Sequence, residues 1–259
     1  LSDSYVSVVE ALRHAGALLG VSPKLSWIDS EKIEREGIRE LEGFAGIIVP
    51  QGWGKRGIEG KIQTIQYCRE KKIPYLGLCF GMQMAVIEFA RNVCGLKDAN
   101  TTEANKKTPY PVIHIMPEQE EYLKKHQYGG TIRLGAWPCK LVEGTKTAEC
   151  YRLHCHSRSN RESRSLSERW IPAFAGMTND LIISERHRHR YEFNNEYRGI
   201  MEKKGLVISG VSPDGKLVEA IELKNHPFFI GTQFHPEYQS RLLRPHPLFL
   251  GFLEAAVKT

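Results

Sequence analysis

Features that mark membrane, secreted and nucleic-acid-binding proteins are missing from this sequence. No apolar run approaches the roughly 20 residues that a membrane span needs, so no membrane partner is expected. The six cysteines form no C-x-x-C pair and no regular framework, and no signal peptide is visible, so we expect a cytoplasmic protein. The net charge of +6 is not concentrated in long tails, and therefore does not by itself indicate nucleic acid.

The chain also lacks the two common phosphate-binding signatures. Residues 50–57, PQGWGKRG, form a glycine-rich loop without the GK[ST] of a P-loop and without G-x-G-x-x-G. These absences disfavour a phosphate cradle at this loop.

What the sequence does contain is the composition of a globular protein with a sizeable core. It has 259 residues, 41% hydrophobic and 25% charged, which suits one large α/β domain. Apolar runs at 44–49 and 73–78 alternate with helical patterns at 58–71 and 82–91. This alternation predicts a doubly wound, mostly parallel sheet flanked by helices, with the site at the carboxyl ends of its strands.

Further elements are predicted along the chain. Helices are expected at 31–40, 194–204 and 248–257, strands at 25–28, 111–115, 206–211, 217–223 and 228–234, and a hairpin between 129–135 and 137–141. The chain starts with a helical pattern where a fold of this kind usually starts with a strand, so we expect the first strand to be missing.

Residues 77–81, GLCFG, join a predicted strand to a predicted helix in the pattern G-x-C-x-G. The hydrolase elbow G-x-S-x-G has the same arrangement, in which flanking glycines leave room for a nucleophile on a strained turn. A helix N-terminus also favours a thiolate. A buried, inert cysteine is the alternative. The glycines and the strand–helix context favour Cys79 as a nucleophile.

A cysteine nucleophile needs a base, and His235 is the best candidate. It follows a buried strand, and Glu237 lies two residues further on, so in an extended segment both side chains point the same way. Pro236 stiffens the spacer. Cys79, His235 and Glu237 are therefore predicted to form a thiol version of the hydrolytic triad. Backbone N–H groups of the 50–57 loop and of Phe80 are expected to face the developing oxyanion.

Taken together, GLCFGMQ and QFHPE resemble the class I (triad) glutamine amidotransferases. SVVEALRHAG, GKRGIEGKI, DANTTE, GGTIRLG and ERHRHRYE narrow the resemblance to the C-terminal glutaminase domain of the CTP synthases. The family implies hydrolysis of L-glutamine to glutamate and ammonia through a cysteine thioester. It also implies a synthetase (amidoligase) domain, absent from this chain, that uses the ammonia, ATP and Mg²⁺ to convert UTP to CTP. For the full-length enzyme, the family implies that GTP is an activator and that the chains form a homo-oligomer, a tetramer.

The resemblance also assigns residues. Cys79, His235 and Glu237 match the catalytic positions, and no position is assigned to a metal. The glutamine-contacting positions match Gly52, Phe80, Gly81, Met82, Gln83, Glu103 and Arg190. Residues 129–135 resemble a GTP-responsive lid. Gln51 stands where the family usually has glycine; if that position needs a positive φ, Gln51 carries strain of about 1 kcal/mol.

Residues 154–178 fall outside the resemblance and look like an inserted segment. The stretch is rich in Ser and Arg, so we expect it to stay mobile. His154, Cys155 and His156 lack an evident fourth metal ligand. Two alternatives to the CTP synthase function remain open, a free-standing γ-glutamyl hydrolase and an inactive fragment. A nucleic-acid patch at 186–190 is disfavoured because alternation along a strand places Arg on one face and His on the other.

Overall fold

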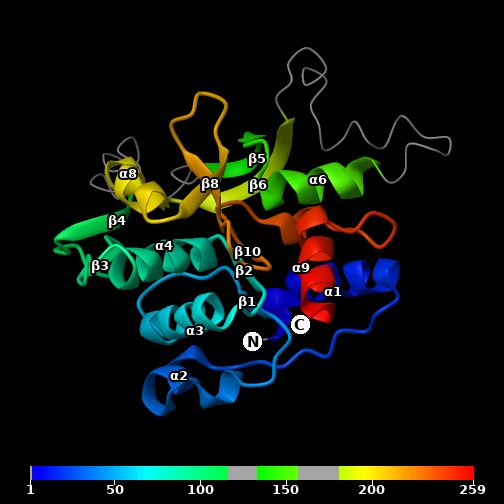
Figure 1. Ribbon diagram of the computed structural model, residues 1–259, viewed down its shortest axis with the longest axis horizontal. Helices are drawn as coiled ribbons and strands as arrows, with labels where there is room; N and C mark the ends of the chain where they lie inside the picture. Colours follow the sequence, from blue (N-terminus) through cyan, green and yellow to red (C-terminus); the bar gives the residue numbers. More distant parts are fainter. Residues whose placement is uncertain (1, 116–132, 157–180) are drawn as a thin grey trace.

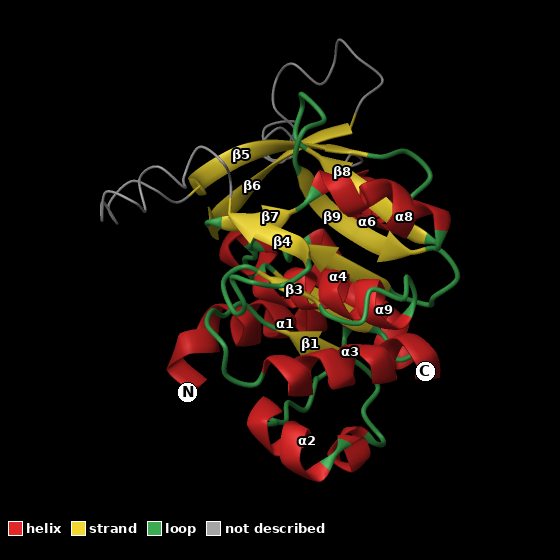
Figure 2. Ribbon diagram, turned by 90° about the vertical axis from the view of Figure 1, so that its left-hand side faces the viewer, coloured by secondary structure: helices red, strands yellow, loops and turns green. Residues whose placement is uncertain are grey.

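A seven-stranded sheet with helices on both faces forms the centre of the computed structural model, which describes residues 2–115, 133–156 and 181–259 (Figures 1 and 2). The strands follow the spatial order β1-β2-β10-β9-β8-β5-β6. Their bounds are Ile47–Val49 (β1), Tyr75–Leu78 (β2), Phe229–Thr232 (β10), Val218–Leu223 (β9), Leu206–Val211 (β8), Arg133–Leu141 (β5) and Leu181–His189 (β6).

Parallel pairing is concentrated at one end of this sheet. β1, β2 and β10 pair parallel to one another, whereas each neighbour pair from β10 to β6 is antiparallel. As a result, five of these seven strands (β1, β2, β10, β8 and β6) run in the same direction. The α/β class expected from the sequence is confirmed. A smaller sheet, in the order β3-β4-β7, consists of Ala99–Thr101 (β3), Tyr110–Ile115 (β4) and Tyr191–Phe193 (β7).

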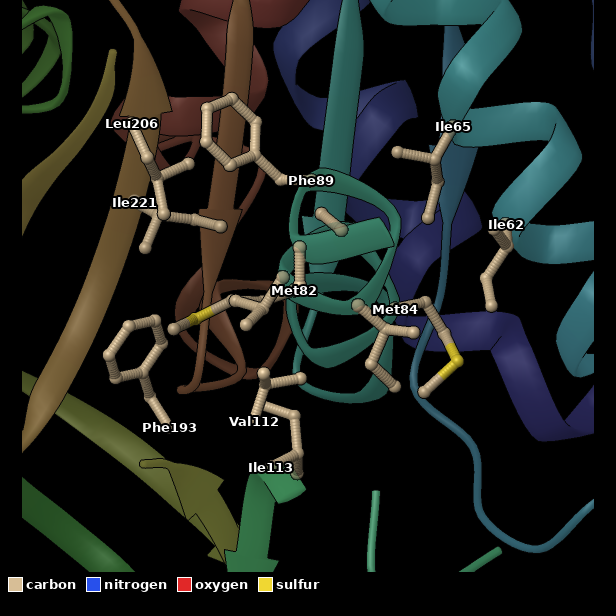
Figure 3. Packing of buried hydrophobic residues seen from close by; sticks show 14 of the residues in the cluster. Ile62, Ile65, Met82, Met84, Phe89, Val112, Ile113, Phe193, Leu206 and Ile221 are labelled. Carbon is tan, nitrogen blue, oxygen red and sulfur yellow. The ribbon is translucent and has the colours of Figure 1, made fainter. Parts of the chain in front are cut away.

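Two apolar cores cover the two faces of the central sheet. One face packs against α3 (Ile58–Lys71) and α4 (Phe80–Asn92), the other against α1 (Val6–Leu19), α6 (Lys146–His156) and α9 (Pro247–Val257). Alternate strand residues serve the two cores: Phe229 joins the first and Ile230 the second. Figure 3 shows α4 between Ile62 and Ile65 of α3 and Ile221 of β9. Both cores therefore hold β2 in place, and the first core holds α4.

The remaining helices are short. They are α2 (Ser30–Glu36), α8 (Arg198–Lys203) and the 3₁₀ turns Ser2–Tyr5, Ile38–Leu41, Asn195–Tyr197 and Pro236–Gln239. In the described parts of the chain, every helix is too short or too polar to cross a membrane.

Three of the predicted elements differ from those in the structure. Residues 25–28 form no strand; Trp27 is exposed and stacks on Tyr5 with 5.7 Å between the ring centroids. The predicted hairpin is wrong, because β5 runs unbroken through Gly135 and pairs with β6 along its length; residues 129–132 lie outside the described range. The predicted 31–40 helix breaks at Gly37, whose φ of 83° leaves the helical region.

Candidate active site

Cys79 occupies the sharp turn between β2 and α4. Its backbone angles, φ 51° and ψ −96°, are rare for a residue with a side chain. The two flanking glycines make the turn possible: a Cβ on Gly77 would lie 2.5 Å from the Tyr75 hydroxyl, and one on Gly81 would overlap the Val49 carbonyl. The strand–elbow–helix geometry expected around Cys79 is present.

The sulfur of Cys79 lies at the carboxyl end of β10. The Cys79 backbone N–H donates to the Thr232 carbonyl at 2.6 Å, which joins the elbow to that strand. Nε2 of Gln233 lies 3.6 Å from Sγ in hydrogen-bonding geometry. Cys79 is only 5% exposed, so the thiol has little direct access to solvent.

His235 and Glu237 form a buried pair. Nδ1 of His235 lies 2.8 Å from Oε1 of Glu237, and the His235 backbone N–H donates to the Arg186 carbonyl of β6. The backbone here differs from the extended segment that we expected, because Glu237 lies in the 3₁₀ turn Pro236–Gln239. The ring of Tyr238 stacks on the imidazole at 5.0 Å and 9°.

The pKa of His235 reflects its two neighbours. Burial alone lowers it, but the interactions with Cys79 on one side and Glu237 on the other outweigh burial and raise the pKa of His235 to about 10. Nε2 is buried and has no other hydrogen-bond partner among the described residues. The imidazole is therefore held in its protonated form beside the sulfur.

The first turn of α4 carries four of the predicted glutamine-contacting residues, Phe80, Gly81, Met82 and Gln83. All four are buried. Phe80 lies against Gly52, since a Cβ on Gly52 would be 3.5 Å from its ring. The side chain of Met82 points into the apolar core beside Phe193 (Figure 3). Only the backbone of Met82 is therefore available to a ligand.

Glu103 and Arg190 come from the segments that follow β3 and β6. Glu103 follows β3 and accepts a hydrogen bond from the Gly54 N–H at 3.0 Å; Arg190 lies between β6 and β7. Burial raises the pKa of Glu103, while the bond from Gly54 and the charge of Arg190 oppose the rise. The hydrogen bond from Gly54 therefore joins the loop after β1 to the segment that follows β3. The φ of Gln51 is not positive, so the strain expected for a left-handed backbone at this position is absent.

Sequence reasoning missed a set of five ionisable residues behind His235, which we call the buried polar cluster. All are at most 7% exposed: Arg133, His187, His189, Glu192 and Glu219. Arg133 Nη1 lies 2.6 Å from Glu219 Oε1, and His187 Nδ1 lies 2.9 Å from His189 Nε2. Burial raises the pKa of Glu219 to about 7 and lowers that of His189 to about 3. Charged residues within the buried strand VEAIEL were the available signal.

A shallow pocket opens beside this cluster. It has a volume of about 290 Å³ and is lined by Leu134, Arg186, His187, Arg188 and Tyr238. His187 and His189 of β6 point inward while Arg186 and Arg188 are exposed, as strand alternation predicted. Tyr238 contributes to the pocket on one side and stacks on His235 on the other.

Comparison with known proteins decides the family. The family model described as glutamine amidotransferase class-I matches residues 1–255. The chain belongs to the class I glutamine amidotransferases. It is 54% identical over 256 residues to the CTP synthase of Caldanaerobacter subterraneus subsp. tengcongensis, covering 98% of this chain and 42% of that protein. The CTP synthase of Bacillus subtilis is 50% identical over 259 residues, covering 100% and 43%.

Solved structures agree with this membership. The Trypanosoma brucei CTPS glutaminase domain with bound acivicin has a TM-score of 0.82 and 36% identity, covering 99% of this chain and 89% of that one. A protein from Thermoplasma acidophilum, described as a putative component of GMP synthase, shares the fold, with a TM-score of 0.51, 16% identity, and coverage of 94% of this chain and 85% of that one. The chain spans about two fifths of the length of its curated relatives.

Proposed function

We propose that this chain is the glutaminase part of a CTP synthase and hydrolyses L-glutamine to glutamate and ammonia. The observation that carries the proposal is Cys79 on a strained elbow beside the buried His235–Glu237 pair, in a chain of the class I amidotransferase family. A nucleophile, a base and an orienting carboxylate are the parts that acyl transfer needs.

The proposed reaction runs through a thioester. The Cys79 sulfur attacks the side-chain carboxamide carbon of glutamine, and the proton on His235 passes to the nitrogen, which leaves as ammonia. His235 then takes a proton from water, the resulting hydroxide attacks the thioester, and glutamate leaves while the sulfur is released. Glu237 keeps Nδ1 occupied and Nε2 directed at the reacting atoms.

Backbone donors at the elbow stabilise the developing oxyanion in this mechanism. The N–H groups of Phe80 and Gly52 are the candidates, because Phe80 begins α4 and packs against Gly52. Gly54 is a poorer candidate, since its N–H already donates to Glu103. Removal of one such donor typically costs about 2.7–4 kcal/mol of barrier.

Charge complementarity supports the assignment of the substrate. Glu103 supplies an anion for the glutamine ammonium group, and Arg190 supplies donors for its carboxylate. The positive charge of Arg190 acts on the carboxylate of Glu103, so the two residues supply opposite charges for the two charged groups of an amino acid. The remaining positions, Gly81, Met82 and Gln83, frame the side chain.

A synthetase domain is the proposed consumer of the ammonia. The curated relatives named CTP synthase are more than twice as long as this chain, which leaves room for such a domain. ATP, Mg²⁺ and UTP are assigned to it, and a homo-oligomer in the cytoplasm is proposed for the whole enzyme. For GTP as activator, the pocket beside Tyr238 is the candidate, because Arg186 and Arg188 suit phosphate oxygens.

Ammonia release from glutamine, with and without GTP and the synthetase domain, tests the proposal. Cys79→Ala is expected to abolish release and to leave the melting temperature within a few degrees, His235→Ala to cost several orders of magnitude, and Glu237→Ala less. With a synthetase domain attached, these variants should still make CTP from supplied ammonia. Loss of that reaction would show that the residues serve folding or the ligase step.

Labelling with a glutamine-like chloroketone identifies the nucleophile directly. Cys79 should be modified alone, since burial raises the pKa of the Cys68 thiol and keeps it neutral. Modification of Cys68 or Cys94 instead would contradict the assignment. Turnover of γ-glutamyl peptides in preference to glutamine would favour the hydrolase alternative.

A further inference from the structure

We propose that Gln233 is a positioning residue for the nucleophile: its side-chain N–H donates to the Cys79 sulfur and stabilises the thiolate. This inference rests on the proposed function, in which Cys79 attacks glutamine. None of the glutamine or triad positions assigned from the family includes Gln233, which lies between β10 and His235.

A chain of hydrogen bonds fixes which end of the Gln233 amide faces the sulfur. The Tyr191 carbonyl can only accept, so the Gln83 atom 2.9 Å from it must be the amide nitrogen. The same nitrogen lies 3.3 Å from the Gln233 amide, which must therefore present its oxygen. The other end of the Gln233 amide, 3.6 Å from Cys79 Sγ, is consequently the N–H donor.

Burial makes this contact energetically necessary. Gln233 is 0% exposed and Gln83 is 3% exposed, so neither amide can exchange partners with bulk water. The Gln233 backbone N–H is also fixed, by a 2.8 Å bond to the Glu219 carbonyl of β9. A buried amide N–H without a partner costs free energy, and the sulfur provides that partner.

The Gln233 contact to the sulfur stays the same throughout the reaction, whereas the His235 contact changes. A donor to sulfur stabilises the thiolate over the thiol. His235 must give its proton to the leaving ammonia, so its support for the sulfur changes during the reaction. Gln233 is neutral and keeps its proton throughout. It can therefore stabilise the sulfur both as the attacking thiolate and again as the leaving thiolate when the thioester breaks.

Gln233→Met is the direct test, because methionine keeps the length and bulk of glutamine and removes the N–H. We expect kcat for glutamine to fall about 10- to 100-fold, with KM changed less than threefold, as for loss of a hydrogen bond to a charged group. The matched control is Gln239→Met, which removes another amide that bonds Ser184 and Glu185 away from the sulfur. The control should keep kcat.

A second readout works without glutamine. Iodoacetamide alkylation of Cys79, located by mass spectrometry, reports the fraction of reactive thiolate. In Gln233→Met the rate near neutral pH should fall about tenfold, and the pH of half-maximal rate should rise. Gln233→Glu, which keeps the shape but replaces the donor by an acceptor, should slow alkylation further and covers the case in which Gln233→Met does not fold.

Alkylation of Cys79 at the wild-type rate and pH midpoint in a folded Gln233→Met or Gln233→Glu variant would overturn the proposal. So would an equal loss of kcat in Gln239→Met, since it would point to general loosening of the site. If the wild-type chain alkylates at Cys79 but releases no ammonia, alone or with its synthetase domain, the proposed function fails, while the alkylation comparison still decides the role of Gln233.

Discussion

Replacing Gly81 by alanine is the sharpest test of how the elbow is built. A Cβ on this residue would lie 3.0 Å from the carbonyl carbon of Val49 and would overlap its oxygen. Since carbon atoms in contact are normally about 3.5–4.0 Å apart, and the Val49 oxygen lies closer still, α4 and the end of β1 must separate by at least about 0.5–1 Å. Both neighbours are backbone atoms, so no side-chain rotation can relieve the overlap.

That separation acts directly on the proposed chemistry. Cys79 directly precedes α4, and β1 leads into the loop with Gly52, so the proposed nucleophile and one proposed oxyanion donor move apart. A misplacement near 1 Å can cost about 100-fold in rate. Overpacking costs about 1–3 kcal/mol of unfolding free energy. For a chain of this length, the melting temperature of Gly81→Ala should fall by roughly 2–10 °C.

Glutaminase kinetics and thermal melts of Gly81→Ala and Gly199→Ala make the comparison. Gly199 lies in α8, and a Cβ there would meet nothing within 4 Å. Its replacement should leave activity unchanged and stabilise the helix by up to about 1 kcal/mol. Wild-type kcat and melting temperature in Gly81→Ala would refute the reasoning, because they would show that the elbow tolerates the extra atom without moving.

Two further predictions concern buried charges. Glu88→Ala removes the fully buried partner of Arg69 and should lower the unfolding free energy by about 3 kcal/mol in denaturant melts. Glu70→Ala removes the half-exposed partner of the same guanidinium and should lower it by under about 1 kcal/mol. Equal losses in the two variants would contradict this prediction. Acid should destabilise the fold through His189, which stays neutral when folded but gains a proton when unfolded below pH 6.5. Between about pH 7 and about pH 5, the unfolding free energy of the wild type should therefore fall by about 2 kcal/mol more than that of His189→Gln. The opposing effect of Glu219 is retained in both proteins. Parallel curves of unfolding free energy against pH would contradict the prediction.

The elbow could be predicted because its determinants are local. A short apolar strand, two glycines and a helical pattern lie within about a dozen residues, and each has a direct steric or electrostatic reason. His235 and Glu237 were likewise found from one strand end. The two side chains are in contact although the backbone was predicted to be extended, because the 3₁₀ turn also brings these two residues together.

The buried polar cluster and the order of the strands could not be predicted in this way. Arg133, His189 and Glu219 come from β5, β6 and β9, and only the tertiary arrangement of the sheet, in which β8 lies between β9 and β5, brings them together. Local pattern also says nothing about which neighbour a strand chooses, so the antiparallel half of the sheet was not foreseen. The predicted insertion at 154–178 remains a prediction: α6 extends to His156, and residues 157–178 lie outside the described range.

The backbone of Cys79 has a consequence for how such proteins change over evolutionary time. Lys72 also has a positive φ, but its ψ of 28° lies near the left-handed minimum, whereas the ψ of −96° at Cys79 does not. Strain of this kind is on the order of 1–3 kcal/mol. Glycine would relieve it, so the mutation that removes the proposed nucleophile also favours the folded state. In a lineage that is no longer selected for glutamine hydrolysis, we expect glycine to replace cysteine at this position. A glycine there would identify a protein that has lost the activity and still folds.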